Sequence, residues 1–279
     1  MDISVLGGLV VRENGVSIAP TAPKPRQVLA LLAFNADQVV SVATLSEELW
    51  GARPPRSAKA TLQTYVLQLR ELIASALLQD PAEAAPRTAK DVLVTAPGGY
   101  MLKTSHADSD VQEFERLAGL GYRSMDAGDY TAAARQLREA LALWKGDVLT
   151  DVQTGPQLSR EARRLEESRL CALDQRIEAE LRIGRHRELL GELSALVSRY
   201  PTHEALHGQF MVALHRSGRR SEALETYQRL RRTLVRDLGL EPSPGIRKLQ
   251  RSLLMTGPEQ APHTAVAVGH GVDRRAHAI

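Results

Sequence analysis

His203, Glu204 and His207 lie in the segment HEALH, which has the residue types and the spacing of a zinc site. On a helix, two histidines four residues apart share one face and can hold Zn²⁺, and the glutamate beside them can act as a general base. This segment therefore raises the question of whether the chain is a metal-dependent hydrolase.

The residues that surround HEALH favour a structural explanation. Thr202 is a suitable N-cap for a helix, and Glu204 then falls in the first turn, where the helix dipole favours a carboxylate. A third metal ligand is also needed, but His215 does not stand at the spacing of the extended zinc-protease patterns. Glu222 or Glu225 could formally supply a ligand, but pairing with the neighbouring arginines is the better explanation of both. We interpret HEALH as a helix start, and we expect no enzyme activity, no metal and no cofactor.

Composition indicates a two-domain protein of the reducing cytosol. The chain has 279 residues, of which 43% are hydrophobic, and Cys171 is its single cysteine, so no internal disulfide can form. Its start, MDISVLGGLVV, has no basic region typical of a signal peptide, and no apolar run has the length of a membrane span. We expect a cytoplasmic, nucleoid-associated protein without a membrane partner, in which Cys171 is buried in a helical core.

Positive charge is concentrated locally, although the net charge is only +3. The segment from Arg53 to Arg70 has four basic residues and no acidic one, and the segment from Arg216 to Arg236 has seven arginines and two glutamates. Such segments are typical of solvated helix faces and also of surfaces that contact phosphate, so charge leaves both interpretations open.

In the first hundred residues, the hydrophobic period changes from that of strands to that of helices and back to that of strands. Short β-like runs surround Asn14-Gly15, which is a strong hairpin signal. Helices are expected at 26–34, at 43–50 with Ser41 as a plausible N-cap, and at 58–73 after the N-cap Ser57. A second hairpin is expected around Pro97-Gly98-Gly99. The order of sheet, three helices and hairpin is that of a winged helix.

The pattern is helical from Asp110 onward. Gly128, Gly184 and Gly218 each separate two amphipathic segments, and the last two are 34 residues apart, which is the tetratricopeptide period. A long helix at 159–181 is expected between the first two turns. We therefore predict residues 1–104 as a winged-helix domain, residues 105–255 as an all-α tetratricopeptide-like domain and residues 256–279 as a disordered tail.

Several separate motifs, in order, resemble the Streptomyces antibiotic regulatory protein family. They are PKPRQVLALLAFNADQVVSVATLSEELWG, ATLQTYVLQLRELI, LVTAPGGYML, ALALWKGDVLTD and LVRDLGLEPSPGIRKLQR. The resemblance implies an OmpR-like winged helix joined to a bacterial transcriptional activation domain. It also implies an activator of a secondary-metabolite (antibiotic) gene cluster. Since G-x-x-x-x-G-K-[ST] does not occur, we expect the small, stand-alone form of the family.

The resemblance also implies which residues contact DNA. The third helix would enter the major groove with Thr61, Tyr65 and Gln68 facing the bases and with Arg70 on a phosphate. Partial burial is the alternative for Tyr65, and a plain turn is the alternative for the hairpin tip that resembles the wing. The full expected set is Arg56, Lys59, Thr61, Gln63, Thr64, Tyr65, Gln68, Arg70, Gly98, Gly99 and Tyr100.

Partners follow from the same resemblance. They are double-stranded DNA with direct repeats, RNA polymerase holoenzyme, and a second copy of the chain that associates head-to-tail on DNA. The loop expected to contact polymerase consists of Gly51, Ala52, Arg53, Pro54 and Pro55. Many relatives carry Ser-Arg where Leu67-Gln68 stands and a basic residue in place of Glu71, so we expect a different operator, because Gln prefers adenine and Arg prefers guanine. The alternative is a helical-repeat scaffold whose winged helix does not bind DNA.

Overall fold

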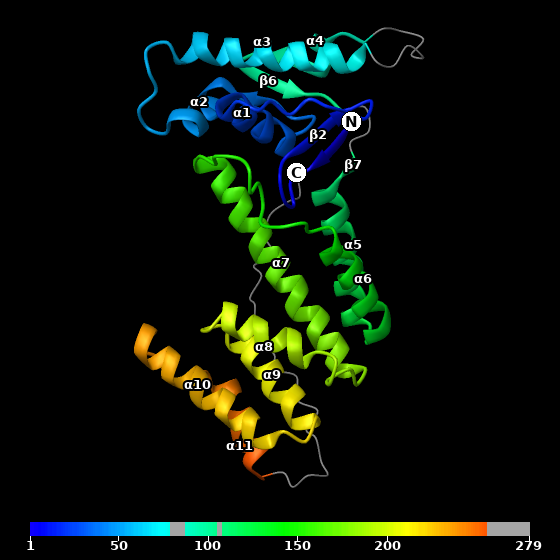
Figure 1. The fold of residues 1–279 in the computed structure, drawn as a ribbon, viewed down its shortest axis with the longest axis vertical. Helices are drawn as coiled ribbons and strands as arrows, with labels where there is room; N and C mark the ends of the chain where they lie inside the picture. The colour runs from blue at the N-terminus through cyan, green and yellow to red at the C-terminus, as the bar shows by residue number, and fades with distance from the viewer. Residues whose placement is uncertain (79–86, 105–107, 256–279) are drawn as a thin grey trace, which may run out of the picture. The chain divides into compact units, whose positions relative to one another are not determined.

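The computed structural model describes residues 1–78, 87–104 and 108–255 (Figure 1). They divide into two compact units, one formed by Met1–Arg123 with Arg135–Leu173 and the other by Ser124–Ala134 with the described residues from Asp174 onward. The expected disordered tail at 256–279 lies outside the described residues. Within the described part of the chain, no helix combines the length and apolar character that crossing a membrane requires.

A four-stranded sheet opens the first unit, in the order β3-β2-β1-β7. Its strands are β1 (Asp2–Ser4), β2 (Val10–Glu13), β3 (Val16–Ser17) and β7 (Asp108–Ser109). The turn between β2 and β3 has positive φ at Asn14 (51°) and Gly15 (76°), as two-residue hairpin turns require, so the predicted hairpin is confirmed. The parallel pairing of β1 with β7 was not predicted.

Three helices follow and pack against one another: α1 (Pro23–Phe34), α2 (Val42–Trp50) and α3 (Ala58–Leu77). The predicted N-cap Ser41 is confirmed, because its Oγ accepts the N–H of Thr44 at 3.0 Å. Ser57 does precede α3, but its side chain makes no capping hydrogen bond, so that part of the prediction was wrong. Gly51 ends α2 with φ of 61°, a conformation that favours glycine.

The second sheet, in the order β4-β6-β5, completes the winged helix. It contains β4 (Val40–Ser41), β5 (Leu93–Ala96) and β6 (Gly99–Leu102), and the short helix α4 (Ala89–Val92) precedes β5. Thr88 and Asp91 form a reciprocal capping box at the start of α4. The predicted hairpin around Pro97-Gly98-Gly99 is confirmed as the turn between β5 and β6.

Helices α5 (Asp110–Asp126), α6 (Tyr130–Ala142) and α7 (Pro156–Arg182) begin the all-α part, and α7 contains the predicted long helix. Within the first unit, Phe114 packs edge-on against Trp144 with ring centroids 5.4 Å apart, and the guanidinium of Arg169 lies 4.6 Å from the Trp144 ring. Cys171 is exposed on α7, so the prediction of a buried thiol was wrong.

The second unit contains α8 (Leu190–Arg199), α9 (Glu204–Arg216), α10 (Arg220–Leu238) and α11 (Pro244–Met255). Helix α9 packs against α8, α10 and α11. The predicted glycine turns are confirmed, because Gly128, Gly184 and Gly218 have φ of 76°, 86° and 79° and each lies between two helices.

Candidate nucleic-acid interface

Helix α3 has one fully buried stripe. Leu62, Val66, Leu69, Ile73 and Ala76 are at most 2% exposed, at spacings of four, three, four and three residues. Such spacing places all five side chains on one face of an α-helix. The opposite face of α3 is therefore not used by the core and is available to a partner.

The exposed face of α3 is mostly polar. The structure leaves Lys59, Gln63, Thr64 and Gln68 exposed, as the expected interface requires. Thr61 and Tyr65 are half-buried and lie at the edge of this face, which agrees with the alternative given for Tyr65.

Leu67 lies at the centre of the same exposed face and is 57% exposed. It was not among the expected site residues. The spacing of the buried stripe contained the signal, because position 67 lies one residue after Val66 and two before Leu69, on the side of the helix opposite the stripe.

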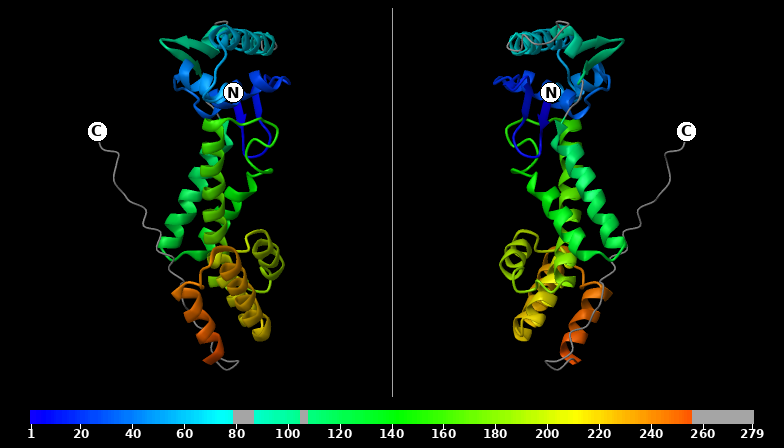
Figure 2. Two further views of the ribbon diagram at one scale, coloured as in Figure 1. Left: turned by 90° about the vertical axis from the view of Figure 1, so that its left-hand side faces the viewer. Right: turned by 90° about the vertical axis from the view of Figure 1, so that its right-hand side faces the viewer.

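Arg70 connects α3 to the wing. Its Nε and Nη2 donate to the carbonyl of Leu93 at 3.1 and 2.7 Å, and Nη2 also donates to Oγ1 of Thr95 at 2.8 Å. Helix α3 and the β5–β6 hairpin lie side by side in all views (Figures 1 and 2). Arg70 thus has a positioning role, and a phosphate contact would fall to its Nη1.

The wing exposes a smaller set of residues than expected. Gly98 is exposed at the tip with φ of 78°, and its carbonyl accepts the N–H of Val42 at 2.9 Å. Gly99 is buried, and a Cβ at this position would lie 2.2 Å from the carbonyl oxygen of Val40, so the close approach requires glycine. Tyr100 is 8% exposed and belongs to the core. The strand register turns the side chain of Tyr100 inward, so the described structure does not display this residue at the tip of the wing.

The loop between α2 and α3, together with the start of α3, carries exposed positive charge. Arg53, Arg56 and Lys59 are exposed, and none of them makes an ion pair within the described ranges 1–78, 87–104 and 108–255. Ala52, Pro54 and Pro55 are also exposed, and Gly51 is half-exposed. All of the residues expected to contact polymerase are thus accessible on one loop beside the start of α3.

Glu48, three residues before this loop, is 3% exposed and binds the start of α7. Its carboxylate accepts the N–H groups of Gly155 (2.5 Å), Gln157 (2.8 Å) and Leu158 (3.1 Å). Gln27 donates from Nε2 to the same carboxylate at 3.0 Å. A carboxylate at a helix N-terminus satisfies N–H groups that have no partner within the helix. Glu48 therefore fixes α2, and with it the loop, to α7 within the first unit.

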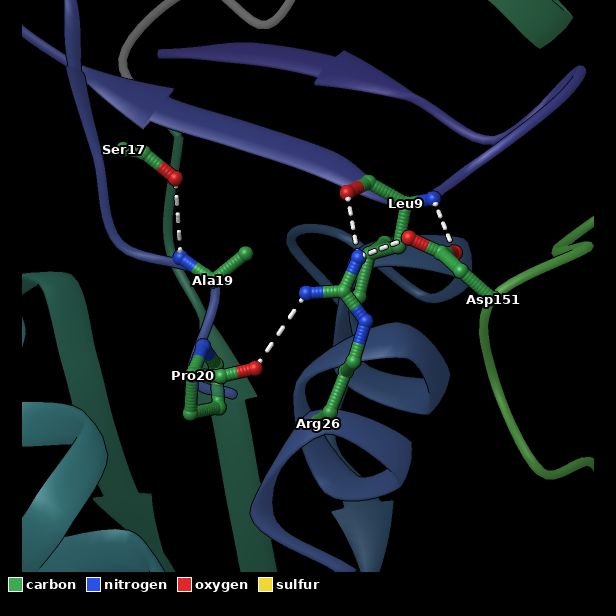
Figure 3. Close-up of polar contacts among 6 residues, drawn as sticks. All are labelled: Leu9, Ser17, Ala19, Pro20, Arg26 and Asp151. Carbon is green, nitrogen blue, oxygen red and sulfur yellow. Dashed lines mark hydrogen bonds and ion pairs between the residues drawn. The ribbon is translucent and has the colours of Figure 1, made fainter. Parts of the chain in front are cut away.

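A second set of contacts fixes the opening sheet in the same unit. Arg26 donates to the carbonyls of Leu9 (3.0 Å) and Pro20 (3.2 Å) and pairs with Asp151, which also accepts the N–H of Leu9 at 2.7 Å (Figure 3). The carboxylate of Asp110 accepts the N–H groups at positions 5 and 6, and burial raises the pKa of Asp110. The winged helix and the segment 145–158 are thus joined by paired polar groups.

The three residues of HEALH that suggested a zinc site have structural roles. Nδ1 of His203 accepts the N–H of Leu206 at 3.4 Å, so His203, and not Thr202 as predicted, is the N-cap of α9. The carboxylate of Glu204 accepts the N–H of Ser243, which precedes α11, at 2.9 and 3.2 Å. His207 is 2% exposed, and burial together with the charge of Arg229 lowers its pKa to about 4. Among the residues that the structure describes, no group of three or more His, Cys, Asp or Glu side chains could hold a metal ion.

Comparisons with known proteins identify two families along the chain. Residues 109–254 match the family described as bacterial transcriptional activator domain, and residues 18–87 match the family described as transcriptional regulatory protein, C terminal. Regulatory protein DnrI of Streptomyces peucetius is 51% identical over 258 residues, which cover 92% of this chain and 93% of DnrI. Regulatory protein AfsR of Streptomyces coelicolor is 35% identical over 258 residues, which cover 92% of this chain and 24% of AfsR.

A solved structure extends the likeness to the fold. Mycobacterium tuberculosis EmbR in complex with a low affinity phosphopeptide superposes with a TM-score of 0.81 at 34% identity, over 93% of this chain and 66% of that chain. Both the order of the domains and their fold are therefore shared with known transcriptional regulators. The chain belongs to the Streptomyces antibiotic regulatory protein family of DNA-binding transcriptional activators.

Proposed function

We propose that the chain binds DNA by placing the exposed face of α3 in the major groove. The observation that carries this proposal is the combination of a polar exposed face (Gln63, Thr64, Gln68) with exposed basic residues at the start of the same helix. A major groove admits one helix, amide side chains can pair with base edges, and basic side chains bind phosphates. Thr64 donates its hydroxyl to the carbonyl of Ala60 at 3.2 Å and can still accept a hydrogen bond from a base.

The other contacts with DNA are assigned to residues that are exposed or half-buried in the structure. Arg53, Arg56 and Lys59 bind phosphates beside the start of α3. Gly98 brings the backbone of the wing to the adjacent minor groove. Tyr65 and Thr61 contact the edge of the groove.

The exposed loop Gly51–Pro55 contacts RNA polymerase holoenzyme. This proposal is supported by the hydrogen bonds that Glu48, near the end of α2, accepts from the start of α7. Because these bonds fix the helix before the loop, the loop loses little conformational entropy when it binds a partner. Residues 1–104 serve as the DNA-binding module, and residues 105–255 serve as the activation module.

The biological role is activation of a secondary-metabolite gene cluster from direct repeats upstream of its promoters. The protein acts in the cytoplasm on the nucleoid, without catalysis. One winged helix reads few base pairs and buries a small interface, so tight binding requires two copies. Sites that point in the same direction require a head-to-tail pair, in which different surfaces of the two protomers meet.

Binding across a salt series tests the DNA-binding proposal. The full chain should bind random-sequence duplexes at low salt, with affinity falling steeply as salt rises through counterion release. A chain that bound no duplex at low salt, but captured protein partners, would be the helical-repeat scaffold instead.

Gel shifts on one repeat and on two repeats test the assembly. Cooperative pairing predicts a higher affinity per site on two repeats, with the free protein sedimenting as a monomer. Equal affinity per site on the two duplexes would contradict head-to-tail assembly.

A further inference from the structure

Leu67 is an apolar side chain at the centre of a polar, exposed face. It is 57% exposed, and its neighbours one turn away, Gln63, Thr64 and Glu71, are exposed as well. The buried stripe of α3 lies on the other side of the helix. Leu67 therefore contributes little to the core, and the stability of the fold does not explain a leucine at this position.

The major groove offers one apolar group to such a side chain. Among the four bases, only thymine presents a methyl group there, whereas adenine, guanine and cytosine present hydrogen-bonding atoms. A leucine placed against those polar atoms would remove them from water without giving them a partner. A central leucine in the groove thus favours thymine and disfavours cytosine at the same position.

We propose that Leu67 determines specificity by packing against the 5-methyl group of one thymine in the operator. This inference rests on the proposed docking of α3 in the major groove. One turn of helix rises about 5.4 Å and one base pair about 3.4 Å, so residues one turn apart reach base pairs about one or two steps apart. The thymine accordingly lies within about two base pairs of the position that Thr64 reads.

Deoxyuridine provides a direct test, because it lacks only the methyl group of thymine and keeps the same base pairing. Duplexes are first selected from a random-sequence pool with the full-length chain. Each thymine of the selected sequence is then replaced singly by deoxyuridine, and Kd is measured by fluorescence anisotropy at one salt concentration. The wild-type chain should lose about fourfold in affinity at one thymine, which corresponds to about 0.8 kcal/mol for one buried methyl group.

The variant Leu67→Ala, measured on the thymine duplex and on the deoxyuridine duplex, completes a double-mutant cycle between the protein and the DNA. It should bind the thymine duplex more weakly than the wild-type chain does, and it should show no further loss when deoxyuridine replaces that thymine. Leu78→Ala is the matched control, because Leu78 is another exposed leucine, the C-cap residue that follows α3, and is 85% exposed. This control should keep the full deoxyuridine effect, and both variants should keep the wild-type Tm.

Three outcomes would overturn the inference. They are a deoxyuridine penalty that persists in Leu67→Ala, the absence of any thymine sensitive to loss of its methyl, and a Leu67→Ala variant that binds DNA normally but activates transcription poorly. The last would assign Leu67 to a protein partner.

The variant Gln68→Ala distinguishes failure of the role of Leu67 from failure of the proposed docking of α3. If Gln68→Ala relaxes one base preference, α3 reads the groove and only the role of Leu67 fails; if neither variant alters DNA binding, the docking itself fails.

Discussion

The carboxylate of Glu48 accepts the N–H of Gly155 at 2.5 Å, and the carbonyl oxygen of Glu48 lies only 2.0 Å from where a Cβ on residue 155 would stand. Only glycine permits this approach, since any side chain at position 155 would collide with the backbone of α2. The two residues are separated by 107 positions in the chain, and their contact sets the position of α2 relative to α7.

Glu48→Gln should lower the stability of the first unit. The amide keeps the shape of the side chain but replaces one acceptor oxygen by a donor, so at least one buried N–H at the start of α7 loses its partner. We expect a loss of about 1–3 kcal/mol, measured as the shift of the urea midpoint. Glu47→Gln is the matched control, because Glu47 is exposed and its carboxylate accepts a hydrogen bond from the Gln157 side chain; the change in stability should stay within about 0.5 kcal/mol. Equal effects of the two substitutions would remove the capping role of Glu48.

Arg70→Ala should disturb the wing as well as DNA binding. The change removes the hydrogen bonds of a charged donor to Leu93 and Thr95, so we expect a loss of about 1.5–3 kcal/mol in the free energy of unfolding. Affinity for specific and random duplexes should fall together. Thr95→Val, which removes only one acceptor, should have a smaller effect on both quantities. Unchanged stability, with a salt slope reduced by about one unit, would instead make phosphate binding the main role of Arg70.

Arg56→Ala should weaken binding to all duplexes similarly, because a phosphate contact carries no sequence information. The slope of log K against log salt should become shallower by about one unit, as measured by anisotropy titrations. Arg163→Ala removes an exposed arginine from α7 and should leave the slope unchanged. A change of base preference in Arg56→Ala would contradict its assignment to the phosphate backbone.

His207 should make stability depend on pH. Its pKa falls from about 6.5 in the unfolded chain to about 4 in the fold, mainly through burial, so the folded state favours the neutral ring. The stabilising contribution is complete above about pH 6.5 and is lost as pH falls toward 4. His207→Leu should therefore flatten the decline of stability over this range, by up to about 3 kcal/mol at its acidic end. Parallel curves for the two proteins, from urea unfolding at each pH, would contradict this account.

The same histidine helps to decide the zinc question. The double variant His203→Ala, His207→Ala should keep promoter activation nearly intact, because the structure gives the pair a capping role and a packing role. Zinc present at one equivalent in the wild-type protein, purified without added metal, and absent from the double variant would show that HEALH binds metal after all.

Local signals in the sequence predicted most of the elements. Asn14-Gly15, the N-cap Ser41 and the glycine turns each act within a few residues, and the structure confirms them. The contacts of Glu48 and the pairing of β1 with β7 could not be predicted in this way, because they join residues about a hundred positions apart. The burial of Tyr100 was not predicted either, because its place beside a glycine turn suggested an exposed wing tip, whereas the strand that pairs with Val40 places the side chain in the core.

Methylation protection by dimethyl sulfate on the selected duplex tests the central claim most directly, because the reagent modifies guanine at N7 in the major groove and adenine at N3 in the minor groove. With the full-length chain bound, we expect protection of guanine N7 at the base pairs that α3 covers. Two results would contradict the placement of α3 in the major groove. One is protection of adenine N3 alone, and the other is a bound chain that protects the phosphates but protects no base from methylation.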